Sequence, residues 1–530
     1  MMLKLEIPSV VTLFTENAKC QLQAAETMQF EDIRITLKCR DRQLQIRLTA
    51  EDSPVTFLRL HWAMPLPAKA LFLGDAWERT YGDIQWRTHA PERMMPWYFL
   101  MNHEDLTAGF GVKVRPSAFA MWSESPEGIT LWLDFRSGTK GVRLDGRTLD
   151  AVTVISAEFP ESSPWEAAGS FCREMCTDPL LPPVPVYGGN NWYYAYGISS
   201  HEEILNDSRY IASLCKGLKN PPFMVIDDGW QIRHGQPENS GPWNAGNSRY
   251  PDMARLADEM RSCGVRPGIW MRPLWNLDPR IPESWLLQAK ENSDRRYLDP
   301  SRPEVLDWVR NDIRRLSGWG YELIKHDFTT FDIFGKWAFE ANPLLAVGSW
   351  SFADSSRTTA EIIISLYRAI LEAADGALIL GCNTIGHLGA GLMHLARTGD
   401  DTSGGRWGRT RKMGVNTLAF RLCQHRSFYD ADADCVGITG EIPWSLNRQW
   451  SELLAKSGTA FFASIRPGIL TAAEFAEMQE FFALASKQDS AAEPLDWMYD
   501  STPAVWRLGR EEKRFHWHEN TPGDLPDFIG

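Results

Sequence analysis

The chain has 530 residues, of which 44% are hydrophobic and 23% are charged, proportions that are typical of a soluble protein of about two or three domains. Its formal net charge of −13 argues against nucleic acid or an anionic membrane as the main partner, because both are bound by basic surfaces.

The first residues and the cysteines indicate a cytoplasmic location. The opening stretch, MMLKLEIPSVVTLF, has one early lysine and no uninterrupted apolar run before Glu16. We therefore expect neither a secretory signal nor a membrane span. The nine cysteines are an odd number and lack CxxC spacing, which favours reduced, buried thiols over a disulfide framework.

Alternating apolar and polar residues run through the first part of the chain, up to about residue 175. In QLQIRLTA, the apolar Leu44, Ile46 and Leu48 alternate with polar side chains, and GITLWLDF and DAVTVISAEF follow the same pattern. The turn clusters SPEG and LDGR separate such runs. The pattern predicts an antiparallel β-sandwich over residues 1–178. The proline-rich stretch DPLLPPVPVYGG then reads as a linker.

From residue 179 to 488, short apolar runs alternate with amphipathic helical stretches, as in repeated β-α units. The eight candidate strands are, in chain order, PVYGGNNW, PFMVIDDGW, RPGIWMRP, YELIKHDF, ALILGCN, MHLARTGDD, DADCVGIT and TAFFASI. Eight parallel strands predict a (β/α)₈ TIM barrel. The tail, residues 489–530, contains PAVWRLGREEKRFHWHEN and predicts a small C-terminal β-structure. The fold class is therefore multidomain α/β.

The sequence also predicts helices between the barrel strands. Ser301 and Glu304 have the spacing of a capping box. The apolar stripe that follows is Val305, Val309, Ile313 and Leu316, and it stops at Gly318 and Gly320; a second stripe is Ile363, Leu366, Tyr367 and Ile370. The fifth and sixth strands are joined by TIGHLGAGL, which is too short for a full helix.

Charged and polar residues gather where the predicted strands end, which is where barrel enzymes carry their reactive groups. They are Asp227 and Asp228 after the second strand, Trp270 and Arg272 after the third, Lys325 and Asp327 after the fourth, Cys382 and Asn383 after the fifth, and Arg397, Asp400 and Asp401 after the sixth. Stability does not explain four neighbouring strand ends loaded with charge, because buried ion pairs barely repay their desolvation.

Hydrolysis of a glycosidic bond is a reaction that uses such a set, since it needs two carboxyl groups that flank a sugar. Lys325 beside Asp327 would lower the pKa of that aspartate and keep it ionised, as a nucleophile must be. A metal site is a weaker interpretation, because the 11 histidines include no HExxH motif and His326 stands alone at its strand end. A phosphate site lacks a P-loop, and GHLGAG lies in the wrong context. We expect no cofactor and no metal.

Five fragments resemble a known family. In chain order, VIDDGWQ, GPWNAGNSRYPDM, GIWMRP, IKHDF and TGDDTS are similar to motifs of the bacterial α-galactosidases of glycoside hydrolase family 36, with relatives in families 27 and 31. The resemblance extends from about Asn191 to Asp401, with a weaker likeness in the N-terminal sandwich that such enzymes also carry. Each fragment alone is weak evidence for the resemblance, whereas the five fragments in this order are strong evidence for it.

The resemblance implies roles for individual residues. Asp327 is then the nucleophile, Asp400 the acid/base, Asp227 and Asp228 bind the O4 and O6 hydroxyls of galactose, Trp192 and Trp270 line the sugar site, and Lys325 contacts ring hydroxyls. Arg272, Cys382, Asn383, Arg397 and Asp401 stand at the same strand ends and are further candidates for substrate binding.

The residue that the resemblance assigns as acid/base depends on how this segment is aligned with the family pattern. The family pattern of small residue, aspartate and polar residue in RTGDDTSGGRW points to Asp400. Counting four residues on from Arg397, as in the family 27 relatives, points to Asp401 instead. Successive side chains near a strand end face opposite sides, so both cannot face the sugar. The prediction from the sequence is Asp400.

Three departures from the family pattern put substrate detail in question. His326 stands between the lysine and the aspartate, where the family more often has an aromatic or small residue. Gly381 and Cys382 replace an expected glutamate-cysteine pair, with Asn383 as a candidate substitute for the lost sugar contact. The chain is also shorter than typical tetrameric members of the family. The resemblance therefore does not imply a tetramer, and a homo-oligomer is one possible state.

The sequence therefore predicts a retaining, exo-acting α-galactosidase with a small carbohydrate as its substrate. An α-N-acetylgalactosaminidase or an α-galactosyl transferase would use the same machinery. A non-catalytic carbohydrate-binding protein is the alternative from another class, and the intact pair of catalytic carboxylates argues against it.

Overall fold

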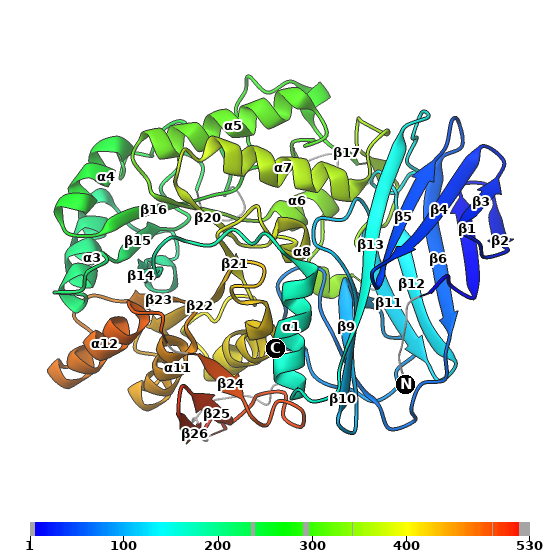
Figure 1. The fold of residues 1–530 in the computed structure, drawn as a ribbon. Coiled ribbons are helices and arrows are strands. Elements are labelled where there is room, and N and C mark those ends of the chain that lie inside the picture. The colour runs from blue at the N-terminus through cyan, green and yellow to red at the C-terminus, as the bar shows by residue number, and fades with distance from the viewer. Residues whose placement is uncertain (1–5, 235–238, 290–295, 342, 490, 519–530) are drawn as a thin grey trace.

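A computed structural model describes residues 6–234, 239–289, 296–341, 343–489 and 491–518 of the chain. Figure 1 shows a β-sandwich, coloured blue to cyan, beside a barrel of strands and helices coloured green to orange. A small red sheet near the C-terminus lies against the lower side of the barrel. The predicted combination of sandwich, TIM barrel and small C-terminal β-structure is confirmed.

Two antiparallel sheets form the sandwich. The first has the order β2 (Lys19–Leu22), β1 (Val10–Thr15), β6 (Val55–Ala63), β12 (Gly128–Asp134), β11 (Phe119–Ser125) and β8 (Met95–Pro96). The second has the order β3 (Thr27–Phe30), β4 (Ile33–Arg40), β5 (Gln43–Thr49), β13 (Thr148–Phe159), β10 (Leu106–Val112), β9 (Tyr98–His103) and β7 (Leu71–Gly74). Leu44, Ile46 and Leu48 are buried between the sheets, as their alternation predicts.

Helix α1 (Pro164–Met175) connects the sandwich to the barrel and packs on β10. Its start is set by a capping box, in which Ser163 and Glu166 bind each other's backbone amides. Phe171 of this helix lies against Gly109, where a Cβ atom would come within 2.6 Å of the ring. The absence of a side chain at Gly109 therefore lets the helix approach the sheet.

Eight parallel strands close the barrel, and all eight sequence predictions are confirmed. They are β14 (Tyr187–Asn190), β15 (Phe223–Ile226), β16 (Arg266–Met271), β18 (Leu323–His326), β20 (Leu378–Gly381), β21 (Leu395–Arg397), β22 (Asp430–Ile438) and β23 (Ala460–Ile465). A barrel wall covered on both faces explains why most of these runs are rich in apolar residues, whereas β22 carries Asp430, Asp432 and Asp434.

Helices surround the barrel (Figure 1). The longer ones are α3 (His201–Leu214), α4 (Met253–Ser262), α5 (Pro303–Gly318), α7 (Thr359–Ala373), α11 (Trp444–Ser457) and α12 (Ala472–Ala485). The shorter ones are α2 (Trp192–Ala195), α6 (Thr329–Phe334), α8 (Gly386–Gly389), α9 (Trp407–Arg409) and α10 (Thr417–Arg421), and residues 410–416 form a π-helical segment. The link between β20 and β21 thus holds only the short α8, as predicted.

The predicted stripes are buried on α5 and α7, whereas the predicted capping box at Ser301 is wrong. Helix α5 begins at Pro303, with Arg302 as its N-cap, because a proline favours the first helical position. The hydroxyl of Ser301 instead accepts from the backbone amide of Asp354, at 3.1 Å.

The C-terminal strands β24 (Ala492–Pro494), β25 (Val505–Leu508) and β26 (Glu511–Arg514) form a three-stranded antiparallel sheet. A second small sheet pairs β17 (Gln288–Ala289) with β19 (Trp350–Ser351). Within the described part of the chain, every helix is too short or too polar to span a membrane.

One segment of the sandwich reaches the barrel directly. Between β7 and β8, Thr80 pairs in parallel with Gly399, just beyond β21. The amide of Thr80 donates to the carbonyl of Thr398 at 2.9 Å, and the amide of Asp400 donates to the carbonyl of Thr80 at 3.0 Å. These two bonds fix the neighbouring residue, Arg79, at the carboxyl end of the barrel.

Candidate active site

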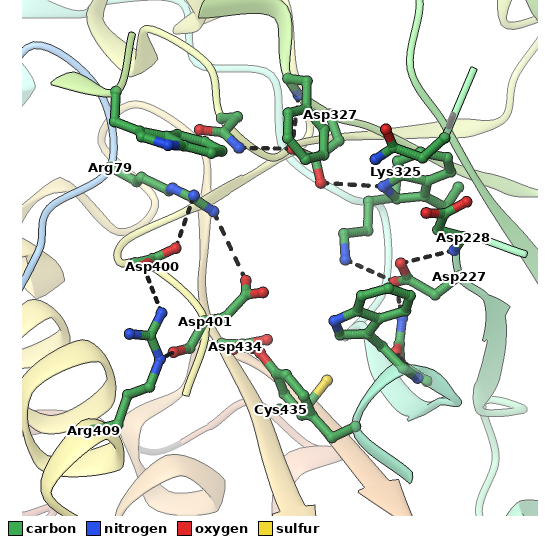
Figure 2. A pocket seen from close by; sticks show the side chains of 18 of the residues that line it. Arg79, Asp227, Asp228, Lys325, Asp327, Asp400, Asp401, Arg409, Asp434 and Cys435 are labelled. Carbon is green, nitrogen blue, oxygen red and sulfur yellow. Dashed lines mark hydrogen bonds and ion pairs between the residues drawn. The ribbon is translucent and has the colours of Figure 1, made fainter. Parts of the chain in front are cut away.

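A cavity of about 370 Å³ lies at the carboxyl ends of the barrel strands (Figure 2). It is lined by six carboxylates, which belong to Asp227, Asp228, Asp327, Asp400, Asp401 and Asp434. Three cations also line it, which belong to Arg79, Lys325 and Arg409. The volume is at the small end of the range of small-molecule sites, and the excess of carboxylates over cations disfavours an anionic ligand.

Asp327 follows β18 and is held on both oxygens. The indole Nε1 of Trp270 donates to Oδ2 at 3.1 Å, and the amide of Asn383 donates to Oδ1 at 3.0 Å. Burial by itself would raise the pKa of Asp327, but Lys325 and Arg79 outweigh it and hold that pKa below its usual value. The carboxylate is therefore ionised and fixed in position, as a nucleophile requires.

Lys325 pairs directly with Asp227 rather than with Asp327. Its Nζ lies 2.8 Å from Oδ2 of Asp227, and the same oxygen accepts from the amide of Asn190 at 2.7 Å. The sequence prediction that Lys325 keeps Asp327 charged thus holds through the field of the cation, whereas the direct contact of Lys325 is with Asp227 at the end of β15, two strands away in the barrel.

Asp228 points into the cavity with one firm partner, the amide of Gln231, which donates to Oδ1 at 2.6 Å. Burial raises the pKa of Asp228 to about 6, and the nearby charge of Asp227 acts in the same direction. Asp227 and Asp228 are adjacent, and the backbone amide of Asp228 donates to Oδ1 of Asp227 at 2.9 Å. Because Gln231 engages only Oδ1 of Asp228, the other oxygen of this carboxyl group is available to a ligand.

Asp400 and Asp401 lie in different surroundings. Both oxygens of Asp400 are taken by guanidinium groups, with Arg79 at 2.7 Å and Arg409 at 2.6 Å. Asp401 lies 3.2 Å from Arg397 and 3.8 Å from Arg79, both measured at its Oδ1. The Asp401 side chain is 38% exposed, against 16% for Asp400. Figure 2 shows Asp401 directed toward the middle of the cavity and Asp400 between the two arginines.

Three predicted residues lie behind the cavity wall. Arg272 forms an ion pair with Asp332 at 2.5 Å and packs 4.2 Å from the ring of Phe328. Its guanidinium therefore supports the loop that follows Asp327, and Arg272 is not among the residues that line the cavity.

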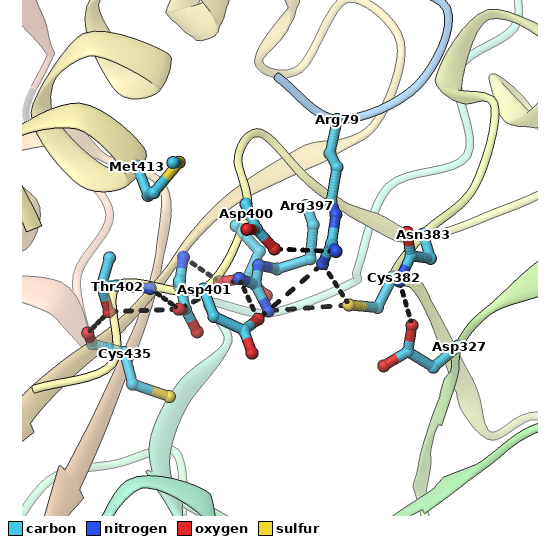
Figure 3. Close-up of polar contacts among 12 residues, drawn as sticks. Arg79, Asp327, Cys382, Asn383, Arg397, Asp400, Asp401, Thr402, Met413 and Cys435 are labelled. Atoms are coloured by element: carbon cyan, nitrogen blue, oxygen red, sulfur yellow. Dashed lines mark hydrogen bonds and ion pairs between the residues drawn. The ribbon is translucent and has the colours of Figure 1, made fainter. Parts of the chain in front are cut away.

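Arg397 and Cys382 are likewise buried behind the wall (Figure 3). Arg397 pairs with Asp434 at 3.0 Å and with Asp401 at 3.2 Å. The Sγ of Cys382 lies 3.6 Å from Arg397 and 3.9 Å from Arg79. Arg397 thus positions two carboxylates, and neither Arg397 nor Cys382 is among the residues that line the cavity.

The remaining predicted residues line the cavity. Trp192 begins helix α2 after β14, Trp270 lies on β16, and Asn383 follows β20. The backbone of Asn383 has a φ of +56°, a left-handed conformation that asparagine tolerates better than most residues. Its amide nitrogen contacts Asp327, and its Oδ1 is buried without a hydrogen-bond partner.

His326, between Lys325 and Asp327, is buried and faces Tyr367 of α7, with ring centroids 5.8 Å apart. Burial lowers the pKa of His326 to about 4, so the ring is neutral. His326 is therefore a packing residue between the barrel and α7. In the described ranges, no three His, Cys, Asp or Glu side chains are grouped as a metal site would need.

Several residues of the cavity were missed by sequence reasoning. Asp434 lies on β22 and accepts hydrogen bonds from Tyr193 and from Thr402. The run DADADC, with three acidic residues in a strand, is a signal that could have identified it. No sequence pattern pointed to Arg79 or Arg409, because nothing in their local sequence places them at the end of a barrel strand.

No family model matches the chain. Solved structures share its fold. The α-galactosidase TtGalA from Thermus thermophilus, in complex with p-nitrophenyl α-D-galactopyranoside, superposes with a TM-score of 0.62 at 19% identity, over 96% of this chain and 99% of that one. The family 36 α-galactosidase AgaA from Geobacillus stearothermophilus gives 0.63 at 15% identity, over 89% and 70%. A family 31 sulfoquinovosidase from E. rectale gives 0.59 at 11% identity, over 97% and 87%.

Proposed function

We propose that the protein is a retaining, exo-acting α-glycosidase and that its substrate carries a terminal α-linked galactose. The observation that carries the proposal is the state of Asp327, a buried carboxylate held ionised by neighbouring cations and fixed by Trp270 and Asn383. It faces a cavity whose opposite side carries a second carboxyl group. Two carboxyl groups across a sugar-sized cavity are what double displacement requires.

In the first step, Asp327 attacks the anomeric carbon and forms a glycosyl ester. The bond from the anomeric carbon to the leaving oxygen breaks, and the acid/base residue gives its proton to that oxygen. In the second step, the same residue takes a proton from water, whose oxygen attacks the anomeric carbon and releases Asp327. The anomeric configuration is therefore retained.

We assign the acid/base role to Asp401 rather than to Asp400, which the sequence pattern favours. Both oxygens of Asp400 are held by guanidinium groups, so neither oxygen can reach a leaving group without breaking an ion pair. The ion pairs of Asp401 are longer and involve one oxygen. Although burial raises the pKa of Asp401, Arg397 and the other nearby cations hold it below its usual value. The empty site thus has Asp401 ionised, and a bound sugar that displaces water favours its uptake of a proton.

Recognition of the sugar falls to the opposite side of the cavity. Among the described residues, only one oxygen of Asp228 is engaged in a hydrogen bond, and Asp227, at the same strand end, forms a charged pair with Lys325 of β18. Carboxylates that accept from O4 and O6 favour the axial O4 of galactose. A site built for that hydroxyl leaves an acceptor unpaired with glucose, at a cost of about 1–3 kcal/mol, which corresponds to roughly ten- to a hundredfold in rate.

A panel of nitrophenyl α-glycosides tests the proposal. We expect release of nitrophenol from the α-galactoside, and we expect the α-glucoside to be slower by about ten- to a hundredfold. Preference for the N-acetylgalactosaminide would instead identify that sugar, and a disaccharide product in the presence of added sugar would identify transfer. If the protein bound glycosides but released nitrophenol from none of them, it would be a lectin, and the proposal would be overturned.

A further inference from the structure

The cavity is walled by aromatic rings beside Arg79, the partner of Asp400. Tyr81 comes from the sandwich segment between β7 and β8, while Trp337 and Phe339 come from the segment after α6. The rings of Tyr81 and Phe339 pack edge to face, with centroids 4.7 Å apart. Phe339 is 60% exposed. Because Phe339 is exposed and also lines the cavity, its ring is open to contact with a ligand.

The carboxylate of Glu78 connects the two segments that form this aromatic wall. Oε1 of the buried Glu78 accepts from the hydroxyl of Tyr81 at 2.6 Å and from the backbone amide of Ala338 at 3.2 Å. The guanidinium of Arg79 also lies over Trp337, 5.4 Å from the ring centroid. The two segments, far apart in sequence, are therefore joined at the wall before any ligand arrives, and such pre-organisation lowers the entropic cost of binding.

The position of the wall relative to the carboxyl groups tells which part of a substrate meets it. Asp227, Asp228 and Lys325 lie together on one side of the cavity, and Arg79, Asp400 and Arg409 lie on the other (Figure 2). A proton donor must reach the oxygen of the bond that breaks. The groups beyond Asp400 and Asp401 therefore face the leaving group, not the sugar that bonds to Asp327.

The charges of the cavity disfavour an anionic leaving group. Arg79 and Arg409 are both paired with Asp400, and Lys325 is paired with Asp227. No lining cation within the described residues is thus left unpaired for an anion. The exposed ring instead suits a ligand with one apolar face, and the C–H face of a pyranose ring is such a surface.

We propose that Phe339, supported by Tyr81 and Trp337, forms the leaving-group subsite and that this subsite takes a neutral pyranose, stacked on the Phe339 ring. The inference rests on the proposed function. It gives the sandwich a direct part in specificity, because the sandwich supplies Tyr81 and the Glu78 carboxylate that fixes the wall.

Two substrates of the sugar that the aryl panel selects separate the inference from the proposed function. One is the α-glycosyl fluoride, whose leaving group is a single atom; the other is a neutral α-linked disaccharide. In Phe339→Ala, we expect the ratio of kcat/KM for the disaccharide to kcat/KM for the fluoride to fall about tenfold from its wild-type value. Phe339→Trp should restore the ratio, because it keeps the stacking surface.

Tyr499→Ala is the matched control, since Tyr499 is an exposed ring, 90% accessible, and is not among the residues that line the cavity. It should leave the ratio at its wild-type value. A disaccharide with a uronate in the leaving position should be hydrolysed more slowly than the neutral one. A ratio that Phe339→Ala does not change, a faster uronate, or a wild-type protein that cleaves the fluoride but not the disaccharide would overturn the inference alone. A wild-type protein that cleaves neither substrate would overturn the proposed function with it.

Discussion

Arg79 and Asp400 form an ion pair with 2.7 Å between Nη2 and Oδ1, although Arg79 belongs to the β-sandwich and Asp400 follows the sixth barrel strand (Figure 3). Arg79 is also 3.8 Å from Asp401, and its charge lowers the pKa of both Asp327 and Asp401. One residue from outside the barrel thus influences three carboxylates of the cavity.

Replacing Arg79 should move the basic limb of the pH profile. The acid must be protonated for the first step, and Arg79 favours its ionised form. Losing the cation in Arg79→Gln therefore raises the pKa of Asp401 and shifts the basic limb of kcat, which reports the enzyme–substrate complex, to higher pH. Arg79→Lys, which keeps the charge, should shift it less. An unmoved basic limb in Arg79→Gln would show that Arg79 does not act on the acid.

The acid/base role can be assigned by azide rescue. Asp401→Ala should lower kcat/KM for a disaccharide by about 10²–10⁴-fold, spare aryl glycosides whose phenolate leaves unaided, and recover turnover when azide attacks the glycosyl-enzyme. Asp400→Ala is the matched control and should show no azide rescue, because its carboxyl is held by Arg79 and Arg409. Rescue confined to Asp400→Ala would restore the assignment that the sequence pattern favours.

The stereochemistry of the product tests the role of Asp327. Double displacement places the two carboxyl groups about 5–5.5 Å apart and retains the configuration, so the first sugar released should be the α anomer. Proton NMR of a fresh reaction measures this before mutarotation. A first-formed β anomer would mean inversion, with Asp327 acting as a base toward water.

Asp228 should give the reaction an acidic limb near pH 6. Burial raises its pKa to about 6, so the carboxyl becomes protonated as the pH falls below that value and stops accepting from a sugar hydroxyl. We expect kcat/KM to fall below about pH 6 in the wild-type protein, and we expect this limb to be absent from Asp228→Asn, whose kcat/KM is lower throughout. A limb that persists in the variant would belong to another group.

The local pattern of the sequence determined the barrel and the carboxyl ends of its strands. In YELIKHDF, alternation sends Lys325 and Asp327 to one side of the strand and His326 to the other, and the structure has His326 buried against Tyr367 while the other two line the cavity. Backbone periodicity is a property of neighbouring residues, so it can be predicted without knowledge of the rest of the chain.

The tertiary structure alone decided which charges meet. Lys325 pairs with Asp227 on another strand, Arg272 turns to Asp332 behind the wall, and Arg79 arrives from the sandwich through the pairing of Thr80 with Gly399. Each of these contacts depends on how sheets and loops pack over long sequence separations, which no local pattern encodes. The pairing of Asp400 with two arginines, and with it our choice of Asp401 as the acid, follows from that packing.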